Sequence, residues 1–331
     1  MAKLDANWTT DTRQLPLLSV SDLRGEDRGR FMDVANAMGE AARAFGFFRI
    51  CDHGIDRALI EATYEAASRF FAQPDAFKHQ YYIAKSSNHR GYVPFTEKGD
   101  YPDEVHRRSL GPNVWPELAD FREVVAQYYA KVSALGRLIC TALEAHLELP
   151  QGAMTDQMSK PISQLRLLHY VRQAATKNHK SVNMGAHTDY ECLTLLHTRN
   201  KGLQVMTQEN TWIDVPVDPD VLIVNIGDMM EAWTNGVFRS TPHRVLNLSA
   251  ERFSLPYFVA TNHDTLIEPF AQLVRPDRPS RYDPFAAGAH LERMLVRDFP
   301  YFRHKMRKDA GCVAEPAVDN PFEQRLKQST P

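Results

Sequence analysis

The sequence predicts a mixed α+β protein whose core is mainly β, and three observations support this. Residues 121–148 carry the longest run of apolar side chains at helical spacing, and residues 28–45 carry a shorter one. From residue 163 onward, short apolar segments alternate with turn-like pieces such as Asp218-Pro-Asp. Many short strands at regular spacing are typical of a β-sandwich or a barrel.

The amino-terminal part alternates expected strands and helices. Leu15-Pro-Leu-Leu-Ser-Val and Gly46-Phe-Phe-Arg-Ile-Cys are strand candidates, and a helix is expected around Arg57 to Ala72, ending before Pro74. Residues 84–120 are rich in Gly, Pro, Asn and charge, which predicts a long loop. Long loops in compact domains often serve as functional lids.

The second half of the chain contains the remaining elements. After residue 262 the sequence is loop-rich, and it becomes helical again near 284–298, before a loose carboxy-terminal tail. The strand candidates of this half are 163–171, 192–198, 202–206, 212–215, 221–226, 243–248 and 252–261.

Composition narrows the class of protein. Of 331 residues, 43% are hydrophobic and 24% are charged, which is ordinary for a globular protein. A net charge of −2 and a pI near 6.7 provide no basic excess for nucleic acid or an anionic membrane. Met1–Thr12 has no signal-like apolar region, and the widely spaced Cys51, Cys140, Cys192 and Cys312 indicate reduced thiols. We therefore expect a cytoplasmic protein, monomeric or weakly homo-oligomeric, with a small-molecule partner.

Two segments carry candidate metal ligands. In Gly185-Ala-His187-Thr-Asp189, positions i and i+2 of an extended chain point to the same face, so an imidazole and a carboxylate share one side. His243 lies further along, in Ser240-Thr-Pro-His243, at the start of a strand candidate. Two histidines and one carboxylate form the facial triad of non-haem Fe(II) oxygenases. The same donors suit a hydrolytic zinc site, and a surface His with a turn Asp is the ordinary alternative.

A second group of residues suits a carboxylate ligand. Arg252 and Ser254 are again i and i+2 on one strand candidate, and a guanidinium fork with a hydroxyl matches a carboxylate. Tyr170 could add a third hydroxyl. A dicarboxylic keto acid could then chelate the metal at one end and bind Arg252 at the other. The alternative, a solvated arginine, is disfavoured by the apolar neighbours Phe253 and Leu255.

Ordered motifs over nearly the whole chain resemble the isopenicillin N synthase-like group of 2-oxoglutarate-dependent Fe(II) oxygenases. The opening module of that group is similar to Leu15-Pro-Leu-Leu-Ser-Val and Gly46-Phe-Phe-Arg-Ile-Cys-Asp-His-Gly-Ile. The remaining motifs follow in the order typical of the group: His187-Thr-Asp189 through Gly202-Leu-Gln-Val, Asn225-Ile-Gly-Asp228-Met, Trp233-Thr-Asn-Gly, Ser240-Thr-Pro-His243-Arg-Val and Arg252-Phe-Ser254.

The resemblance implies a distorted jelly-roll core, the cupin-like double-stranded β-helix, with flanking helices. An amino-terminal dioxygenase module with its long loop would span residues 1–120 and a scaffold helix residues 121–150. The jelly-roll oxygenase core would span residues 151–262, and a carboxy-terminal loop and helix residues 263–331. Together these parts would form one compact structural unit.

The resemblance also implies the ligands and the reaction. Fe(II) would be held by His187, Asp189 and His243, and the distal carboxylate of 2-oxoglutarate by Arg252 and Ser254, with Tyr170 assisting. Such an enzyme uses O₂ and releases succinate and CO₂ while it hydroxylates, desaturates or cyclises a small molecule, either a specialised metabolite or an amino-acid-like compound. Ascorbate is expected to be stimulatory.

Further residues are given roles on the same basis. His53, His169 and His197 are expected to be structural, and Gly227 with Asp228 to form the turn before the second ligand strand. The expected substrate contacts are equally compatible with ordinary packing, and they are Tyr92, Phe95, Tyr190, Phe258 and Asn262.

This sequence departs from the pattern of the group at several positions, which limits the prediction of its substrate. Leu168 and Val171 stand where plant members often have Asn and Pro, and the segment from Asp100 to Leu110 is abrupt, so no particular substrate is predicted. Three alternatives stay open: an iron oxidase that does not use 2-oxoglutarate, of the isopenicillin N synthase or ethylene-forming type; a non-catalytic jelly-roll binding protein; and a zinc hydrolase.

Overall fold

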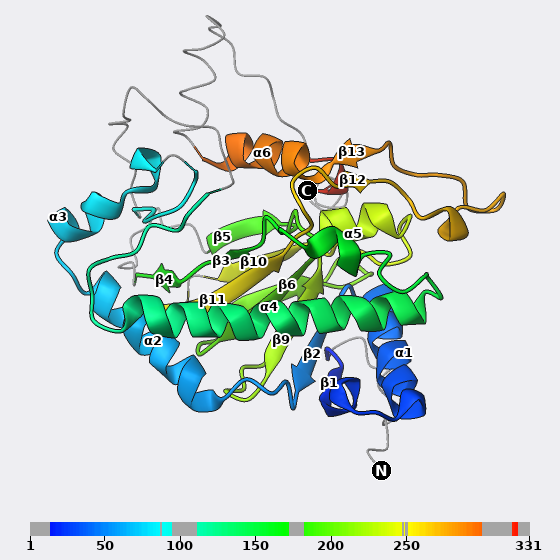
Figure 1. Cartoon of the computed structure of the whole chain (residues 1–331), viewed down its shortest axis with the longest axis horizontal. Coiled ribbons are helices and arrows are strands. Elements are labelled where there is room, and N and C mark those ends of the chain that lie inside the picture. The colour runs from blue at the N-terminus through cyan, green and yellow to red at the C-terminus, as the bar shows by residue number, and fades with distance from the viewer. Residues whose placement is uncertain are drawn as a thin grey trace, which may run out of the picture.

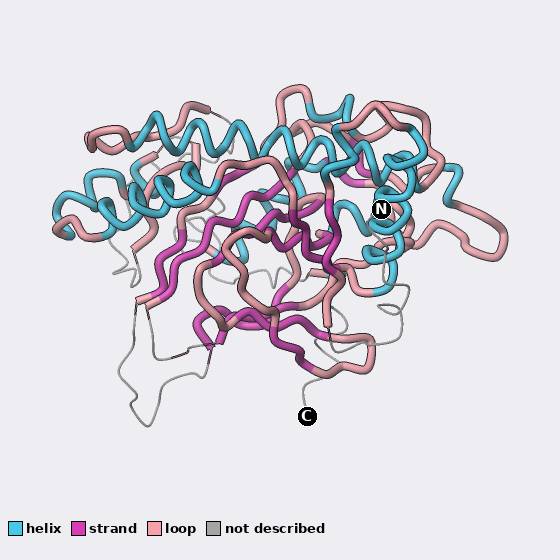
Figure 2. Tube along the Cα trace, turned by 90° about the horizontal axis from the view of Figure 1, so that it is seen from below, coloured by secondary structure: helices cyan, strands magenta, loops and turns pink. Residues whose placement is uncertain are grey.

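Two β-sheets lie face to face, and helices cover the outer face of the larger sheet (Figure 1, Figure 2). An apolar cluster joins the sheets and includes Phe47 and Ile223 of the larger one with Leu203, Val205 and Val245 of the smaller one. This arrangement is the double-stranded β-helix that the sequence predicted. The computed structural model describes residues 14–86, 88–94, 111–171, 182–246, 248, 251–299 and 320–323.

The larger sheet positions the inner wall of the site. Neighbouring strands are antiparallel except for the first pair. All five residues of its central strand Leu222–Ile226 are buried, as expected for a strand covered on both faces. In the described residues the order is β1 (Leu17–Ser19), β2 (Phe47–Cys51), β9 (Leu222–Ile226), β6 (Leu193–Thr198), β11 (Arg252–Val259) and β3 (Gln164–Leu165), with β4 (Leu168–Tyr170) also paired to β11.

The smaller sheet is antiparallel and carries both candidate histidine ligands. His187 ends one strand, His243 begins the next, and the two residues pair directly across the ladder. The sequence patterns did not separate the first of these strands, because its polar and glycine residues show no apolar alternation. Within the described residues the order is β5 (Val182–His187), β10 (His243–Leu246), β7 (Leu203–Met206) and β8 (Trp212–Asp214).

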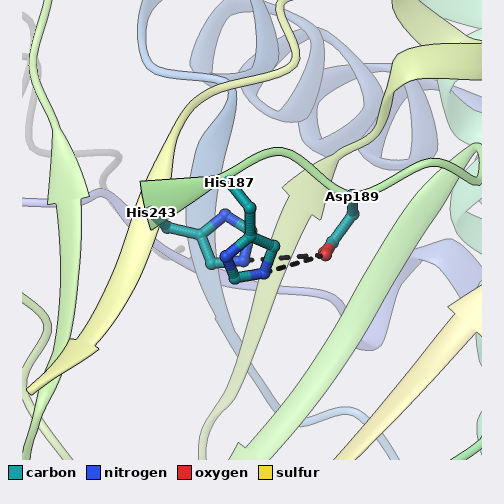
Figure 3. Close-up of side chains that lie close together, drawn as sticks. All are labelled: His187, Asp189 and His243. Atoms are coloured by element: carbon teal, nitrogen blue, oxygen red, sulfur yellow. Dashed lines mark ion pairs between the residues drawn. The ribbon is translucent and has the colours of Figure 1, made fainter. Parts of the chain in front are cut away.

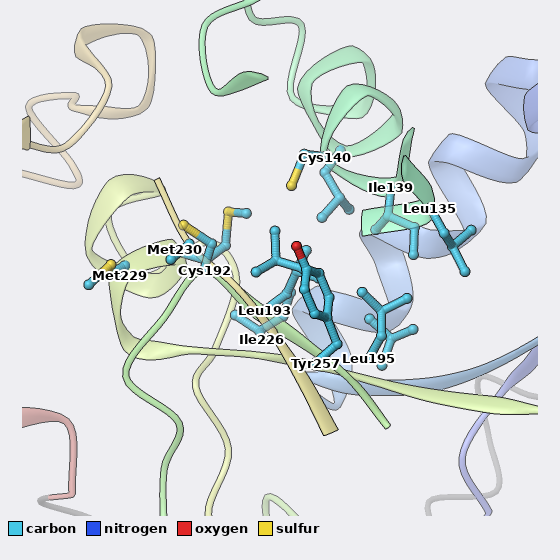
Figure 4. Packing of buried hydrophobic residues seen from close by; sticks show 14 of the residues in the cluster. Leu135, Ile139, Cys140, Cys192, Leu193, Leu195, Ile226, Met229, Met230 and Tyr257 are labelled. Atoms are coloured by element: carbon cyan, nitrogen blue, oxygen red, sulfur yellow. The ribbon is translucent and has the colours of Figure 1, made fainter. Parts of the chain in front are cut away.

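Helix α4 (Phe121–His146) runs along the outer face of the larger sheet, with α1 (Arg28–Ala44) and α2 (Arg57–Phe71) packed beside it (Figure 1). Side chains of α4 meet Leu195 and Tyr257 of the sheet in the apolar core (Figure 4). Gly136 allows the close approach, because a Cβ there would lie 2.6 Å from Cγ2 of Val259. No helix in the described part of the chain is long and apolar enough to cross a membrane.

Shorter elements complete the described chain. They are α3 (Asp75–Lys78), α5 (Asp228–Trp233), the strand pair β12 (Leu266–Ile267) and β13 (Phe285–Ala286), and α6 (Ala287–Asp298). One expectation is wrong in detail: Asp228 does not lie in a turn before the second ligand strand. Gly227 caps α5, and Asp228 is its fully buried first residue. The backbone N–H of Asp228 donates to the carbonyl of Asp189, at 2.8 Å, so α5 starts against the ligand loop.

Candidate metal centre and co-substrate site

Three candidate ligands come together between the two sheets. The side chains of His187, Asp189 and His243 point toward one another, and one donor atom from each lies within 4.8 Å of the others (Figure 3). Oδ1 of Asp189 is 3.8 Å from Nε2 of His187 and 3.6 Å from Nε2 of His243. The structure therefore gathers the two imidazoles and the carboxylate that the sequence predicted.

Hydrogen bonds at Nδ1 of each imidazole orient the ring so that Nε2 faces Asp189. Nδ1 of His187 lies 2.8 Å from the carbonyl of Gly185, and Nδ1 of His243 lies 3.3 Å from the carbonyl of Thr241. Carbonyl oxygens only accept, so both Nδ1 atoms donate, and each ring in its neutral form has its lone pair on Nε2. Burial, with His187 nearby, lowers the pKa of His243 to about 4, so that ring is neutral.

The facing atoms fit a cation. With both rings neutral, two nitrogen lone pairs and a carboxylate oxygen converge, which is unfavourable unless a positive ion sits there. Nitrogen and oxygen donors without thiolate match Fe(II) in the two-histidine, one-carboxylate set.

The second oxygen of Asp189 is held by the larger sheet. Its Oδ2 accepts hydrogen bonds from the Thr194 hydroxyl, at 2.6 Å, and from the Asn225 amide, at 2.7 Å. Thr194 on β6 and Asn225 on β9 are direct cross-strand partners. Burial raises the pKa of Asp189, but His243, His187 and these two donors together bring it below its usual value. Oδ1 is thereby left as an ionised oxygen that faces the two histidines.

A buried polar cluster supports the loop between the ligands. The Thr188 hydroxyl donates to Oδ2 of Asp228, at 3.3 Å, and the Asn320 amide donates to the same oxygen, at 2.8 Å. Asn320 also donates to the Thr188 hydroxyl, at 3.2 Å. Burial raises the pKa of Asp228 well above its usual value. The far carboxy-terminal segment is thus tied to the residue between His187 and Asp189.

The predicted carboxylate anchor lies on the inner face of the larger sheet. Arg252 on β11 pairs with Tyr170 on β4, and its guanidinium carbon lies 4.8 Å from the centre of the Tyr170 ring. The Tyr170 ring packs against the apolar cluster between the sheets. Phe47 of that cluster makes an edge contact with His243, with ring centres 5.4 Å apart. Anchor and metal centre therefore share one interior space.

Arg252 has no charge partner among the residues that the structure describes. It is 3% exposed, its Nη1 donates to the Ser254 hydroxyl at 3.2 Å, and burial lowers its pKa. Its Nε is buried without a hydrogen-bond partner in that part of the chain. A buried guanidinium without a counter-ion is costly, so this geometry suits an anionic ligand.

The expected substrate contacts are dispersed. Tyr190 donates to Asp298, and its hydroxyl accepts from Arg297 at 2.7 Å. Asn262 bonds to the backbone of Lys160 and to Ser159, on the loop before β3. These bonds engage the polar groups of both residues, and their contact with substrate stays a prediction.

The aromatic residues among the expected substrate contacts have different surroundings. Tyr92 packs against Phe70 and Phe71, beside α2. Phe258 lies on β11 beyond the anchor residues, with the guanidinium of Arg166 over its ring. Phe95 lies outside the described residues.

The sequence patterns missed the side chains that hold Asp189 and the ligand loop. Asn225 interrupts a strand that is otherwise apolar, and that interruption was the available signal. Thr194 shares its strand with the polar residues His197 and Thr198, so the pattern there gave no such signal. The histidines expected to be structural are bonded within the fold. His197, for example, is fully buried between the Tyr64 hydroxyl, at 2.8 Å, and the carbonyl of Pro219, at 3.1 Å.

Fold and site together define a mononuclear non-haem iron oxygenase, and similarity to known proteins places the chain more narrowly. Residues 162–261 match the family model of the 2OG-Fe(II) oxygenase superfamily. Residues 15–118 match the model described as non-haem dioxygenase in morphine synthesis N-terminal.

Known relatives and solved structures agree. A 2-oxoglutarate-Fe(II) type oxidoreductase of Aspergillus fumigatus is 30% identical over 298 residues, which cover 81% of this chain and 88% of the relative. Clavatol oxidase of Penicillium crustosum is 31% identical, covering 77% of this chain and 88% of the relative. A 2OG-Fe(II) oxygenase family protein from Caulobacter crescentus superposes with a TM-score of 0.74 at 30% identity, over 86% of this chain and 99% of that one.

A further solved structure contains ligands. A Neurospora crassa protein, crystallised in complex with alpha-KG and 5-formyluracil, has a TM-score of 0.75 at 25% identity and covers 86% of this chain and 97% of its own. The chain belongs to the 2-oxoglutarate- and Fe(II)-dependent oxygenase superfamily. It is a non-haem iron dioxygenase that uses 2-oxoglutarate and O₂.

Proposed function

We propose that His187, Asp189 and His243 hold Fe(II), and that Arg252 and Ser254, with Tyr170, hold the distal carboxylate of 2-oxoglutarate. The observation that carries the metal assignment is the convergence of both histidine Nε2 atoms on Oδ1 of Asp189. The anchor assignment is supported by a buried guanidinium that has no counter-ion in the described chain and lies on the same interior face.

The reaction is the oxidation of a small molecule by hydroxylation, desaturation or ring closure. Bound Fe(II) and 2-oxoglutarate supply the oxidising chemistry, with succinate and CO₂ as co-products. The chain's own residues position these groups and keep the interior dry. Clavatol oxidase among the relatives supports a specialised metabolite as substrate. The division into modules at residues 120, 150 and 262 and a monomeric or weakly oligomeric state belong to the same proposal.

The decisive assay is succinate formation with Fe(II), ascorbate, 2-oxoglutarate and a panel of small molecules. Asp189→Ala leaves two neutral ligands, so we expect it to lose both bound iron and turnover. Asp220→Ala is the matched control, because that exposed carboxylate forms its ion pair with Arg57 at the surface. Full iron occupancy and turnover in Asp189→Ala would contradict the metal assignment.

The anchor is tested separately. Arg252→Gln removes a charge-assisted contact of about 1.5–3 kcal/mol, so the 2-oxoglutarate requirement should rise about 10- to 150-fold. Arg30→Gln is the control, since that arginine is exposed on α1. Turnover that consumes O₂ without releasing succinate would favour the oxidase that does not use 2-oxoglutarate.

A further inference from the structure

A second arginine lies in a slot formed by two aromatic rings. Arg166 follows β3, and its backbone N–H donates to the carbonyl of Pro256 on β11, at 3.0 Å. Its guanidinium carbon is 5.1 Å from the centre of the Phe258 ring and 5.7 Å from that of Phe299, at the end of α6. The side chain is therefore held between two rings rather than extended into solvent.

The register of β11 places this slot next to the metal ligands. Side chains at alternate positions share one face of a strand, so Phe258 faces the same interior as Arg252 and Ser254. Phe258 pairs directly with Thr194 on β6, whose hydroxyl donates to Asp189. Side chains of directly opposite residues lie about 5 Å apart at Cβ. Arg166 is thus connected to the candidate metal centre through Phe258, whose cross-strand partner Thr194 donates to Asp189.

A further arginine follows a residue that contacts the slot. Arg90 follows His89, whose ring makes an edge contact with Phe299, with centres 4.8 Å apart. The hydrogen bond of the Arg90 side chain among the described residues goes to the carbonyl of His89, at 3.2 Å. Burial lowers the pKa of Arg90, and the positive charge of Arg166 contributes in the same direction. The two half-buried cations therefore lie within electrostatic reach of each other.

Within the described residues this positive charge is not balanced. Among the carboxylates that the structure describes, none lies within ion-pair distance of Arg166 or Arg90. Buried Glu191 is within electrostatic reach of Arg166, but one carboxylate against two guanidiniums leaves a net positive charge. Removing a guanidinium partly from water without a partner is costly, and an anionic ligand would offset that cost.

We propose that Arg166 and Arg90 bind a carboxylate group of the substrate, so that the enzyme acts on small organic acids. This inference rests on the proposed function, since it places the acid beside the metal centre. The guanidinium forks match a carboxylate, and the rings of Phe258 and Phe299 flank the apolar body of the molecule. Arg252 stays assigned to 2-oxoglutarate, so the two acids have separate anchors.

The test measures binding by isothermal titration calorimetry on the full chain, loaded with Mn(II) and 2-oxoglutarate so that no turnover occurs. The probes are a panel of aryl and alkyl carboxylates, including phenylacetate and hexanoate, each paired with its neutral primary amide. We expect acids to bind at least about tenfold more tightly than their amides, because only the acids pair with a charge. Arg166→Gln and Arg90→Gln should each weaken acid binding by about 10- to 100-fold, whereas Arg166→Lys should retain part of it.

Separate readouts distinguish this inference from the function on which it rests. The 2-oxoglutarate affinity should stay unchanged in Arg166→Gln and Arg90→Gln, which also reports that both variants fold. Arg30→Gln should leave every affinity unchanged. If 2-oxoglutarate binds but acids bind no better than amides, or if Arg166→Gln keeps full acid affinity, the substrate inference is wrong and the proposed function stands. Failure of the Mn(II)-loaded wild type to bind 2-oxoglutarate overturns both.

Discussion

The hydrogen bond from Asn225 to Asp189 should control how tightly the chain holds its metal, and Asn225→Ala tests this. The Asn225 amide lies 2.7 Å from Oδ2, the oxygen that faces away from the imidazoles. Both residues are buried, so water has little access to replace the lost donor. The substitution leaves Thr194 as the remaining side-chain donor described at that oxygen.

The expected magnitude follows from the charge on the acceptor. A hydrogen bond to a charged group contributes about 1.5–3 kcal/mol, and side chains that orient metal ligands typically change metal affinity by about 10- to 100-fold. Losing the donor also raises the pKa of Asp189, because the hydrogen bond favours the ionised form. Protons then compete with the metal at higher pH than in the wild type. The affinity deficit should therefore widen as the pH falls.

Calorimetry with Mn(II) measures the effect, and Gln127→Ala on the exposed face of α4 is the control. Thr194→Val completes a double-mutant cycle. Because both donors share Oδ2, their combined loss should differ from the sum of the single losses by about 0.5–3 kcal/mol. An Asn225→Ala protein with wild-type metal affinity at every pH would refute the reasoning, as would strictly additive behaviour of the pair.

Three further predictions concern the structure around the site. Asn320→Ala should lower the thermal midpoint and weaken Mn(II) binding in calorimetry, because it removes the amide that ties the carboxy-terminal segment to Thr188 of the ligand loop and to Asp228 of α5; unchanged metal affinity would limit Asn320 to stability alone. Burial lowers the pKa of His290 to about 4, so only the unfolded chain gains the proton as pH falls through about 6.5. Lowering the pH from 7.5 to 5 should therefore reduce the unfolding free energy of the wild type by about 2 kcal/mol through His290. In urea denaturation, His290→Leu should lose less unfolding free energy than the wild type over the same pH range. Gly136→Ala should lower the unfolding free energy by about 1–3 kcal/mol in the same assay, because its Cβ would collide with Val259; a neutral result would mean that α4 moves outward freely.

Local patterns in the sequence predicted most of the fold. The helix expected at 121–148 is α4, because its apolar stripe has the period of a helix and faces the sheet. The strand expected at 163–171 divides into β3 and β4, and Arg166 follows the first of them. Nothing in the apolar pattern marks that break, because both pieces pair with the same long strand β11.

The ligands were predictable where their geometry is local, and their supports were not. His187 and Asp189 share a face because they are two positions apart on an extended chain, with one residue between them, and the sequence contains that relation directly. Thr194 and Asn225 reach Asp189 only through the register of β6 against β9, which a single sequence does not fix. Asn320 comes from a segment remote in sequence, so only the folded chain reveals its contact.

Each of the two sheets contributes different residues to the site, so the site needs both. The smaller sheet supplies the two imidazoles, and the larger sheet supplies the donors that hold the Asp189 carboxylate. The larger sheet also supplies Arg252, the arginine that we propose binds 2-oxoglutarate. Asp189 joins them, because Oδ1 faces the histidines while Oδ2 is bound by the larger sheet. Separating the sheets would therefore remove the metal site and the anchor together. The apolar cluster that joins the two sheets therefore supports both sites.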